Sequence, residues 1–153
     1  MKRIFILLII CDLFFCSMNA QIHFHANVAN NHLWRGMEVA DGMVFTSDIS
    51  ITDKNEYFRI GLWGGTNTSG TYKEFNHYVS FTYRQLNLSV WDTYNFSPGA
   101  TYNNKEYFNY SAHSTGRFID ATLSYRFGKQ FPLFVAWSTI LFGRDRNTNN
   151  TAN

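Results

Sequence analysis

The sequence predicts an all-β chain, an antiparallel up-and-down meander of about seven long strands that follows an N-terminal signal peptide. Three observations predict it. Apolar and polar residues alternate with a period of two along most of the chain. Small and polar residues separate the alternating segments, and no long segment shows the 3.6-residue period of a helix. Aromatic residues, which are enriched in strands, make up 18% of the 153 residues.

The first twenty residues have the layout of a secretory signal peptide. Met1–Arg3 carries positive charge, Ile4–Ile10 is apolar, and small or polar residues lead to Ala20. We expect cleavage after Ala20 and therefore export of residues 21–153. Both cysteines of the chain, Cys11 and Cys16, lie in this segment. Residues 21–153 therefore contain no cysteine, which excludes a disulfide scaffold and thiolate chemistry in the exported part.

Seven segments alternate in this way, mostly over eight to ten residues. They are Ile22–Trp34, which alternates at its start, then Met43–Ile51, Phe58–Gly64, Phe75–Tyr83, Leu86–Tyr94, Phe118–Phe127 and Leu133–Phe142. In Leu86–Tyr94, for example, Leu88 and Val90 share one face, and Ser89 lies on the other. Strands of soluble sandwiches average about five or six residues, whereas tilted membrane-spanning strands need about nine to eleven. The lengths therefore favour a barrel with lipid outside and water inside.

The connections between these segments alternate between short and long. The short ones are Asp53–Asn55, Arg84-Gln85 and Gly128–Pro132, and the long ones are Met37–Gly42, Gly65–Lys73 and Asn95–Arg117. Outer-membrane barrels combine short periplasmic turns with longer outward loops. Aromatic residues at or near strand ends agree with an interfacial belt: Trp34, Phe45, Tyr57, Trp63, Tyr83, Trp91, Tyr94, Phe127 and Phe142. The sequence thus predicts a partial or small outer-membrane-type β-barrel over residues 21–143, with a polar, disordered tail over 144–153.

The odd number of strands predicts that this barrel is incomplete. Bacterial single-chain barrels have an even number of strands. Seven strands would leave two unpaired sheet edges in lipid, where backbone groups find no water. We therefore expect at least one further strand after Asn153 in intact relatives.

Three motifs carry a resemblance to a known family. They are Trp34-Arg35-Gly36, Gly61-Leu62-Trp63-Gly64-Gly65 and Trp91-Asp92-Thr93-Tyr94-Asn95. The chain resembles a family of uncharacterised Gram-negative, Bacteroidota-like outer-membrane-type β-barrels with W-R-G and G-x-W-G strand motifs. The resemblance covers most of Ala26–Asn147 and implies a barrel in the cell outer membrane. It implies no enzymatic activity, and related barrels continue through further strands.

Seven side chains are the candidate lining of the lumen: Asp48, Arg59, Arg84, Trp91, Asp92, Asp120 and Arg126. An arginine on the lipid face at mid-bilayer would cost about 2–4 kcal/mol, so the charged residues are expected to point inward. Two interpretations remain open. The charges form a salt-bridged plug that fills a narrow barrel, or they line a pore that selects solutes.

Two groups of residues suggest other chemistry. His23 and His25 share one strand face and could chelate a metal, but no carboxylate lies nearby to complete a site, so we expect no metal and no cofactor. His113 and Ser114, with Asp120 or Glu106 as the third member, suggest a lipid hydrolase of the outer membrane.

The sequence predicts an exported outer-membrane β-barrel of passive, structural or porin-like role and no enzymatic activity. Its expected partners are outer-membrane lipid and, in transit, the export and barrel-assembly machinery. The net charge of +2 provides no basic field for nucleic acid. Two alternatives stay open: a secreted soluble β-sandwich that binds glycans through exposed aromatic residues, and a barrel-embedded lipid-modifying enzyme.

Overall fold

The computed structural model describes residues 20–102, 104–112, 114–128 and 131–144, and it is all-β over these ranges. The strands are β1 (Gln21–Ala29), β2 (His32–Trp34), β3 (Met37–Ala40), β4 (Val44–Thr52), β5 (Phe58–Asn67), β6 (Lys73–Tyr83), β7 (Leu86–Asn95), β8 (Arg117–Arg126) and β9 (Phe134–Gly143). Apart from Ala20 and Arg144, the predicted signal peptide and polar tail lie outside the described residues. Among those that are described, no helix is long and apolar enough to cross a membrane.

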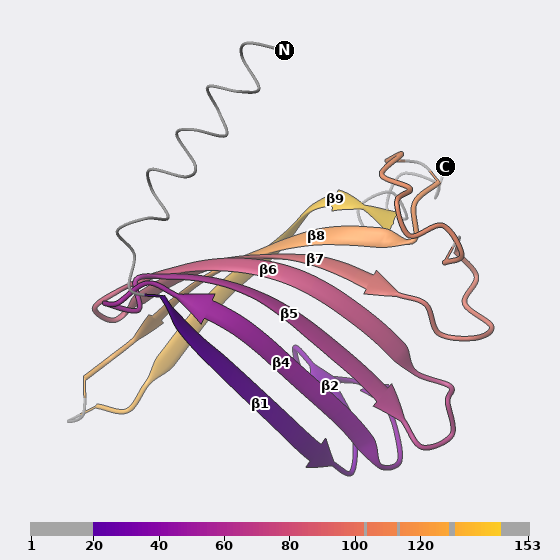
Figure 1. Cartoon of the computed structure of the whole chain (residues 1–153), viewed down its shortest axis with the longest axis horizontal. Coiled ribbons are helices and arrows are strands. Elements are labelled where there is room, and N and C mark those ends of the chain that lie inside the picture. The colour runs from indigo at the N-terminus through magenta and orange to yellow at the C-terminus, as the bar shows by residue number, and fades with distance from the viewer. Residues whose placement is uncertain (1–19, 103, 113, 129–130, 145–153) are drawn as a thin grey trace.

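Seven strands form one antiparallel sheet in the order β1-β4-β5-β6-β7-β8-β9 (Figure 1). Successive strands are neighbours except where β2 and β3 intervene as a separate two-stranded sheet. The predicted seven-strand meander is therefore confirmed. The sheet curves strongly, yet β1 and β9 do not pair with each other in the described part of the chain. This is an open sheet and not a closed barrel.

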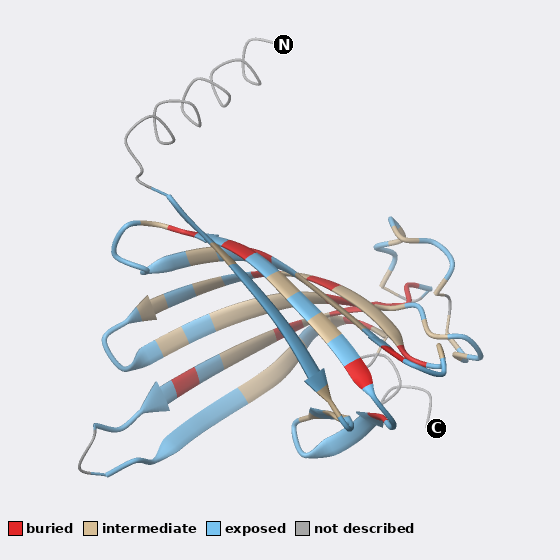
Figure 2. Cartoon of the chain, turned by 60° about the horizontal axis from the view of Figure 1, so that its bottom comes forward, coloured by how far each residue is buried: buried red, intermediate tan, exposed pale blue. Residues whose placement is uncertain are grey.

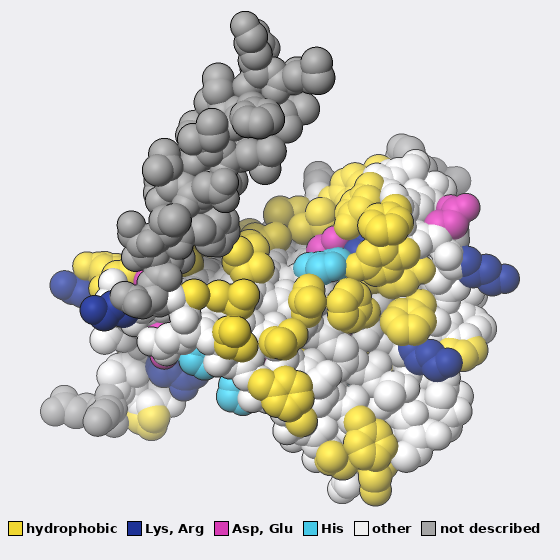
Figure 3. Space-filling model, in the orientation of Figure 1, with side chains coloured by type: hydrophobic (Ala, Val, Ile, Leu, Met, Phe, Trp, Pro, Cys, Tyr) yellow, Lys and Arg dark blue, Asp and Glu magenta, His cyan; other side chains and the backbone are white. Residues whose placement is uncertain are grey.

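The two faces of the sheet have opposite chemistry. One cross-strand row on the convex face is apolar, and it runs through Ile51, Ile60, Val79, Val90 and Ala121. The adjacent row on the concave face runs through Ser50, Gly61, Tyr78, Trp91 and Asp120. Exposure follows the same division, since Ile60 is 63% exposed and Ser50 only 1%. Figure 2 shows this alternation along the strands, and Figure 3 shows hydrophobic side chains spread over the convex face.

The first strand is shorter than predicted. β1 ends at Ala29, and residues 32–34 and 37–40 form the β2–β3 hairpin, so Trp34 does not close the first strand and 37–42 is not an open loop. Arg35 and Gly36 have φ of 53° and 80°. A turn with two successive positive φ values reverses the chain in two residues. The W-R-G motif is therefore the tip of a hairpin, and that hairpin lies on the concave side of the sheet.

The contrast between short and long connections is weaker than the sequence predicts. Segments 53–57 and 84–85 and the described residues of 127–133 lie at one end of the sheet, and 30–43, 68–72 and the described residues of 96–116 lie at the other. Segment 68–72 is no longer than 53–57, because β5 and β6 extend to Asn67 and Lys73 through residues predicted as loop. Only the hairpin segment and 96–116 are distinctly long.

A small apolar cluster fixes the base of the hairpin. Ala40, Val44 and Tyr72 are buried together, and Trp63 packs against them. Buried Asn67 joins these segments, because its side-chain amide donates to the Asp41 carbonyl at 3.4 Å and its oxygen accepts from the Tyr72 N–H at 3.0 Å. Burial, with Glu74 nearby, raises the pKa of Tyr72 well above its ordinary value. The hairpin therefore has a fixed position on the sheet.

Candidate functional site

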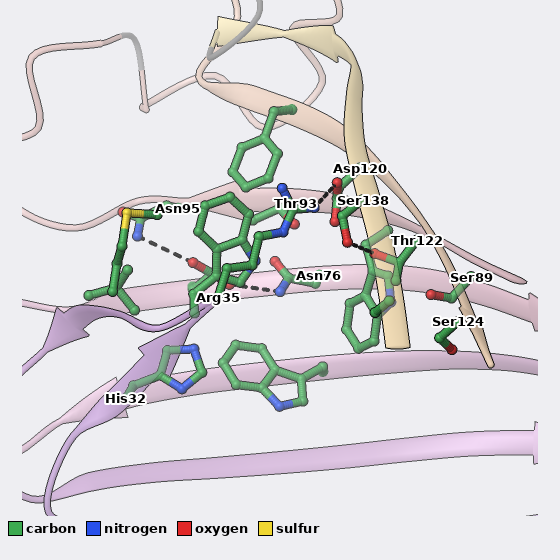
Figure 4. Close-up of a pocket in the computed structure, with 18 of the residues that line it drawn as sticks. His32, Arg35, Asn76, Ser89, Thr93, Asn95, Asp120, Thr122, Ser124 and Ser138 are labelled. Carbon is green, nitrogen blue, oxygen red and sulfur yellow. Dashed lines mark hydrogen bonds and ion pairs between the residues drawn. The ribbon is translucent and has the colours of Figure 1, made fainter. Parts of the chain in front are cut away.

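A cavity of about 710 Å³ lies between the hairpin and the concave face of the sheet. The hairpin, β5–β9 and Arg144 all contribute side chains to it (Figure 4). Three of the four tryptophans of the chain, Trp34, Trp63 and Trp91, line it. Much of the remaining lining consists of asparagine, serine and threonine.

An ion pair holds the tip of the hairpin over the cavity. The Arg35 guanidinium pairs with the Asp120 carboxylate of β8, and the two side chains are 31% and 8% exposed. The guanidinium also lies 4.5 Å from the centre of the Trp34 ring, and that ring meets Phe118 edge-on at 5.7 Å. Arg35 occupies a backbone region that a non-glycine residue rarely adopts. These contacts offset the strain and close one side of the cavity.

Two aromatic residues on neighbouring strands, Tyr78 and Trp91, form an aromatic wall. The rings of Tyr78 and Trp91 stack 4.2 Å apart with an interplanar angle of 17°. The Tyr78 ring reaches this position by lying over Gly61, where a Cβ would overlap the ring. Gly61 therefore makes room for the stacked pair.

Rows of small polar side chains lie beside this wall, toward the short turns. Ser80, Ser89, Thr122 and Ser138 form one cross-strand row, and Thr82, Asn87 and Ser124 form the next. The Thr122 and Ser138 hydroxyls hydrogen-bond at 2.7 Å, and the Asn87 amide donates to Thr82 at 2.8 Å. These short side chains leave space on the concave face and present both donors and acceptors.

Amides surround a carboxylate on the opposite side of the wall. Asn76 and Asn95 donate to the two oxygens of Glu74 at 2.8 and 3.4 Å. The Arg144 guanidinium lies 3.9 Å from the centre of the Tyr102 ring and 5.0 Å from that of Phe118. The side-chain charges of the lining comprise two arginines and three carboxylates, so the lining is close to neutral.

A second cluster lies on the convex face, under the 96–116 segment. Arg117 is fully buried, with its Nε 3.0 Å from Asp92 and its Nη1 2.9 Å from the Tyr107 carbonyl. The rings of Tyr94, Tyr107 and Tyr110 surround its guanidinium at 5.0, 4.5 and 4.8 Å.

Hydroxyl contacts attach the 96–116 segment to the same cluster. The Tyr110 hydroxyl donates to Asp92 at 2.7 Å, and the Tyr107 hydroxyl hydrogen-bonds the His77 ring at 2.8 Å. Burial, followed by the Asp92 contact, raises the pKa of Tyr110. The long segment therefore covers polar and charged groups that would otherwise interrupt the apolar convex face.

The predicted lumen residues fall into two groups. Those on the concave face are Asp48, Arg59, Trp91, Asp120 and Arg126. Two predictions are wrong. Asp92 lies on the convex face, because it shares its strand parity with Leu88 and Val90. Arg84 lies in the β6–β7 turn with φ of 54°, and its guanidinium is 5.3 Å from the Tyr83 ring centre.

The three tryptophans of the sequence motifs do not lie where an interfacial belt would place them. Trp34, Trp63 and Trp91 line the concave cavity, so their assignment to a membrane interface is wrong. Tyr57 and Tyr83 do lie at the short-turn end, half-exposed and edge-on at 6.0 Å. Gly64 lies on the convex face, opposite Ser47 and Phe75.

The prediction from sequence missed Arg117 and Tyr78. Arg117 lies two residues before Ile119 in β8, so both side chains lie on the convex face. A charged side chain on this apolar face indicates that another segment covers it. Tyr78 in β6 lies directly opposite Gly61 in the neighbouring β5. A glycine beside a large aromatic residue indicates a close contact between the ring and the backbone.

The structure adds no further ligand or catalytic partner, within the residues it describes, to the suggested metal site or to the suggested hydrolase site. His23 contacts the Thr52 hydroxyl at 3.0 Å, and no group of three metal-ligating side chains occurs among residues that the structure describes. His113 lies outside the described residues, and the Ser114 hydroxyl contacts the Asn109 amide at 3.3 Å. Comparison of the chain with protein-family models, curated proteins and solved structures found no match.

Proposed function

We propose that this is an exported outer-membrane protein whose sheet forms barrel wall, with its convex face in lipid and its concave face toward water. One observation carries the proposal, the inverted burial of the sheet. The exposed convex residues are apolar, whereas the shielded concave residues are largely polar. A membrane-spanning barrel alternates apolar-out and polar-in, with lipid in place of a covering layer. The role is passive and porin-like, without a catalytic step or cofactor.

The extent of the exposed apolar surface supports lipid over water as its surroundings. It covers all seven strands of the sheet and includes Ile22, Phe24, Ile49, Ile60, Val79, Leu88, Leu123 and Trp137. Soluble proteins rarely expose continuous apolar patches beyond a few hundred Å². A soluble sandwich would cover this face with a second sheet. Within the described ranges the second sheet is only the β2–β3 hairpin, and it lies on the concave side.

Neighbouring residues in β6 provide a direct test. Val79 faces outward in the middle of its strand, and Ser80 faces the concave side. We expect Val79→Arg to lower the free energy of unfolding in lipid by about 2–4 kcal/mol, the cost of an arginine at the bilayer midplane. Ser80→Arg should have a smaller effect, because its charge would reach water. Folding of the full chain into lipid vesicles, followed by urea titration, measures both.

The two environments predict opposite orders for this pair. In water, arginine at the exposed Val79 should cost little, and arginine at the half-buried Ser80 should cost more. A larger loss for Ser80→Arg, or full-length protein recovered soluble from periplasm or medium, would contradict the proposal. Recovery in the outer-membrane fraction is the expected result.

A further inference from the structure

The concave cavity has the size and polarity of a small-molecule site. Its volume of about 710 Å³ lies within the range of about 300–1,000 Å³ for such pockets. Two of its charged side chains, Arg35 and Asp120, neutralise each other, and Glu74 accepts from two amides. With two arginines and three carboxylates in the lining, the site has only a small net charge with which to attract a strongly charged ligand. The lining therefore favours a neutral ligand with many hydrogen-bonding groups.

The aromatic wall adds a flat apolar surface to this polar lining. One face of the Trp91 ring is stacked on Tyr78, and Trp91 also lines the cavity. The ring is held in place from behind, so little side-chain freedom would be lost when a ligand binds. The negative face of an aromatic ring attracts the positive edge of polarised C–H bonds.

The rows of hydroxyls and amides begin directly beside Trp91. Ser89 lies two residues before Trp91 on the same strand face, and Thr122 lies opposite Ser89 (Figure 4). Asn87 lies in the next cross-strand row. Hydroxyls both donate and accept, and amides offer one group of each kind. An aromatic platform with such groups at its edge complements a sugar ring, which has a C–H face and a rim of hydroxyls.

We propose that this cavity binds a neutral saccharide, with Trp91 as the stacking platform and Ser89, Asn87 and Thr122 as hydrogen-bond partners. The inference rests on the proposed function, because it names the class of solute that the concave face would take. Tyr78 is a positioning residue that acts by holding the Trp91 ring. Gly61 acts in turn by making room for Tyr78.

Titration of the full-length protein in detergent micelles tests the site. The neutral probes are maltose, cellobiose and N,N′-diacetylchitobiose, and the comparison probes are digalacturonate and the amino acid phenylalanine. We expect at least one neutral disaccharide to bind, and we expect Trp91→Ala to lower the affinity for that disaccharide by at least tenfold. Trp91→Phe should restore part of the affinity, since it keeps a stacking ring. Ser89→Val should weaken binding by a few fold.

Trp137 supplies the matched control. It is 65% exposed on the convex face, opposite Leu123, so Trp137→Ala should leave saccharide affinity unchanged. The inference is overturned if no neutral disaccharide binds, if digalacturonate or phenylalanine is preferred, or if Trp137→Ala weakens binding as much as Trp91→Ala. Membrane insertion without saccharide binding overturns only this inference. Saccharide binding by a protein that does not insert overturns only the membrane proposal.

Discussion

The two long connections fold back over opposite faces of the same sheet, and each does so at an arginine–aspartate pair. Over the concave face, Arg35 lies in the hairpin and Asp120 in the sheet, and the pair remains partly open to solvent. Over the convex face, Arg117 and Asp92 both belong to the sheet. There the covering segment contributes tyrosine rings and a carbonyl to a fully buried guanidinium.

This difference indicates what each covering segment is for. The concave face is polar and tolerates a partly hydrated ion pair, so the hairpin narrows the cavity without sealing it. The convex face is apolar, and an uncovered ion pair there would be costly in lipid. Segment 96–116 converts that pair into a buried cluster with an aromatic outer surface. An arginine–aspartate pair therefore borders the cavity on the concave face, and a second such pair is covered by aromatic side chains on the convex face.

Substitution of Arg117 on the convex face should cause the greatest loss of stability. Arg117→Ala removes a buried charge and leaves Asp92 without its guanidinium, at a cost of about 3 kcal/mol. Urea unfolding in micelles measures this loss. The 96–116 segment should also become accessible, so trypsin should cleave faster after Lys105. Arg126→Ala, at an exposed concave position, is the control and should cost less than about 1 kcal/mol. Equal losses in the two variants would remove the special role of Arg117.

The second effect concerns the aromatic wall on the concave side. Gly61→Ala places a methyl group against the Tyr78 ring and should cost about 1–3 kcal/mol of unfolding free energy. Displacement of Tyr78 should also change the fluorescence of Trp91. Gly64→Ala in the same strand is the matched control, because its nearest contact would be an ordinary 3.8 Å to Phe75. If both variants behave alike, the Gly61–Tyr78–Trp91 arrangement does not hold.

The hairpin ion pair should contribute less than the Arg117 cluster. A double-mutant cycle with Arg35→Gln and Asp120→Asn should give a coupling free energy of about 1 kcal/mol, because Arg35 is partly exposed. Urea unfolding of the four proteins provides the measurement. A coupling as large as that between Arg117 and Asp92 would contradict the contrast between the two faces.

The smallest effect is that of the Tyr110 hydroxyl. Tyr110→Phe keeps the ring beside Arg117 and removes the bond to Asp92, so it should cost less than about 1 kcal/mol. Because the folded-state pKa is raised, the Tyr110 contribution is present below the ordinary tyrosine pKa of about 10 and is lost as pH rises through the raised value. Unfolding free energies across this range should fall less steeply in Tyr110→Phe. A steeper fall in the variant would contradict the raised pKa of Tyr110 in the folded protein.

The sequence predicts the sheet well because alternation is local. The segment Leu86–Tyr94 matches β7 to within one residue, and parity alone puts Trp91 and Ser89 on one face. The same parity places Asp92 on the other face, although its charge favours the polar one. The hairpin, the Arg117 cluster and the Tyr78 stack depend on contacts between distant segments. Periodicity carries no information about such contacts.

Quenching of tryptophan fluorescence by bromine-labelled lipid acyl chains reports which face of the sheet contacts lipid. Two variants are needed, one that retains only Trp137 and one that retains only Trp91, with phenylalanine at the other tryptophan positions. After folding into vesicles, Trp137 on the convex face should be strongly quenched, and Trp91 on the concave face should be spared. Equal quenching, or stronger quenching of Trp91, would contradict the assignment of the convex face to lipid and the concave face to water.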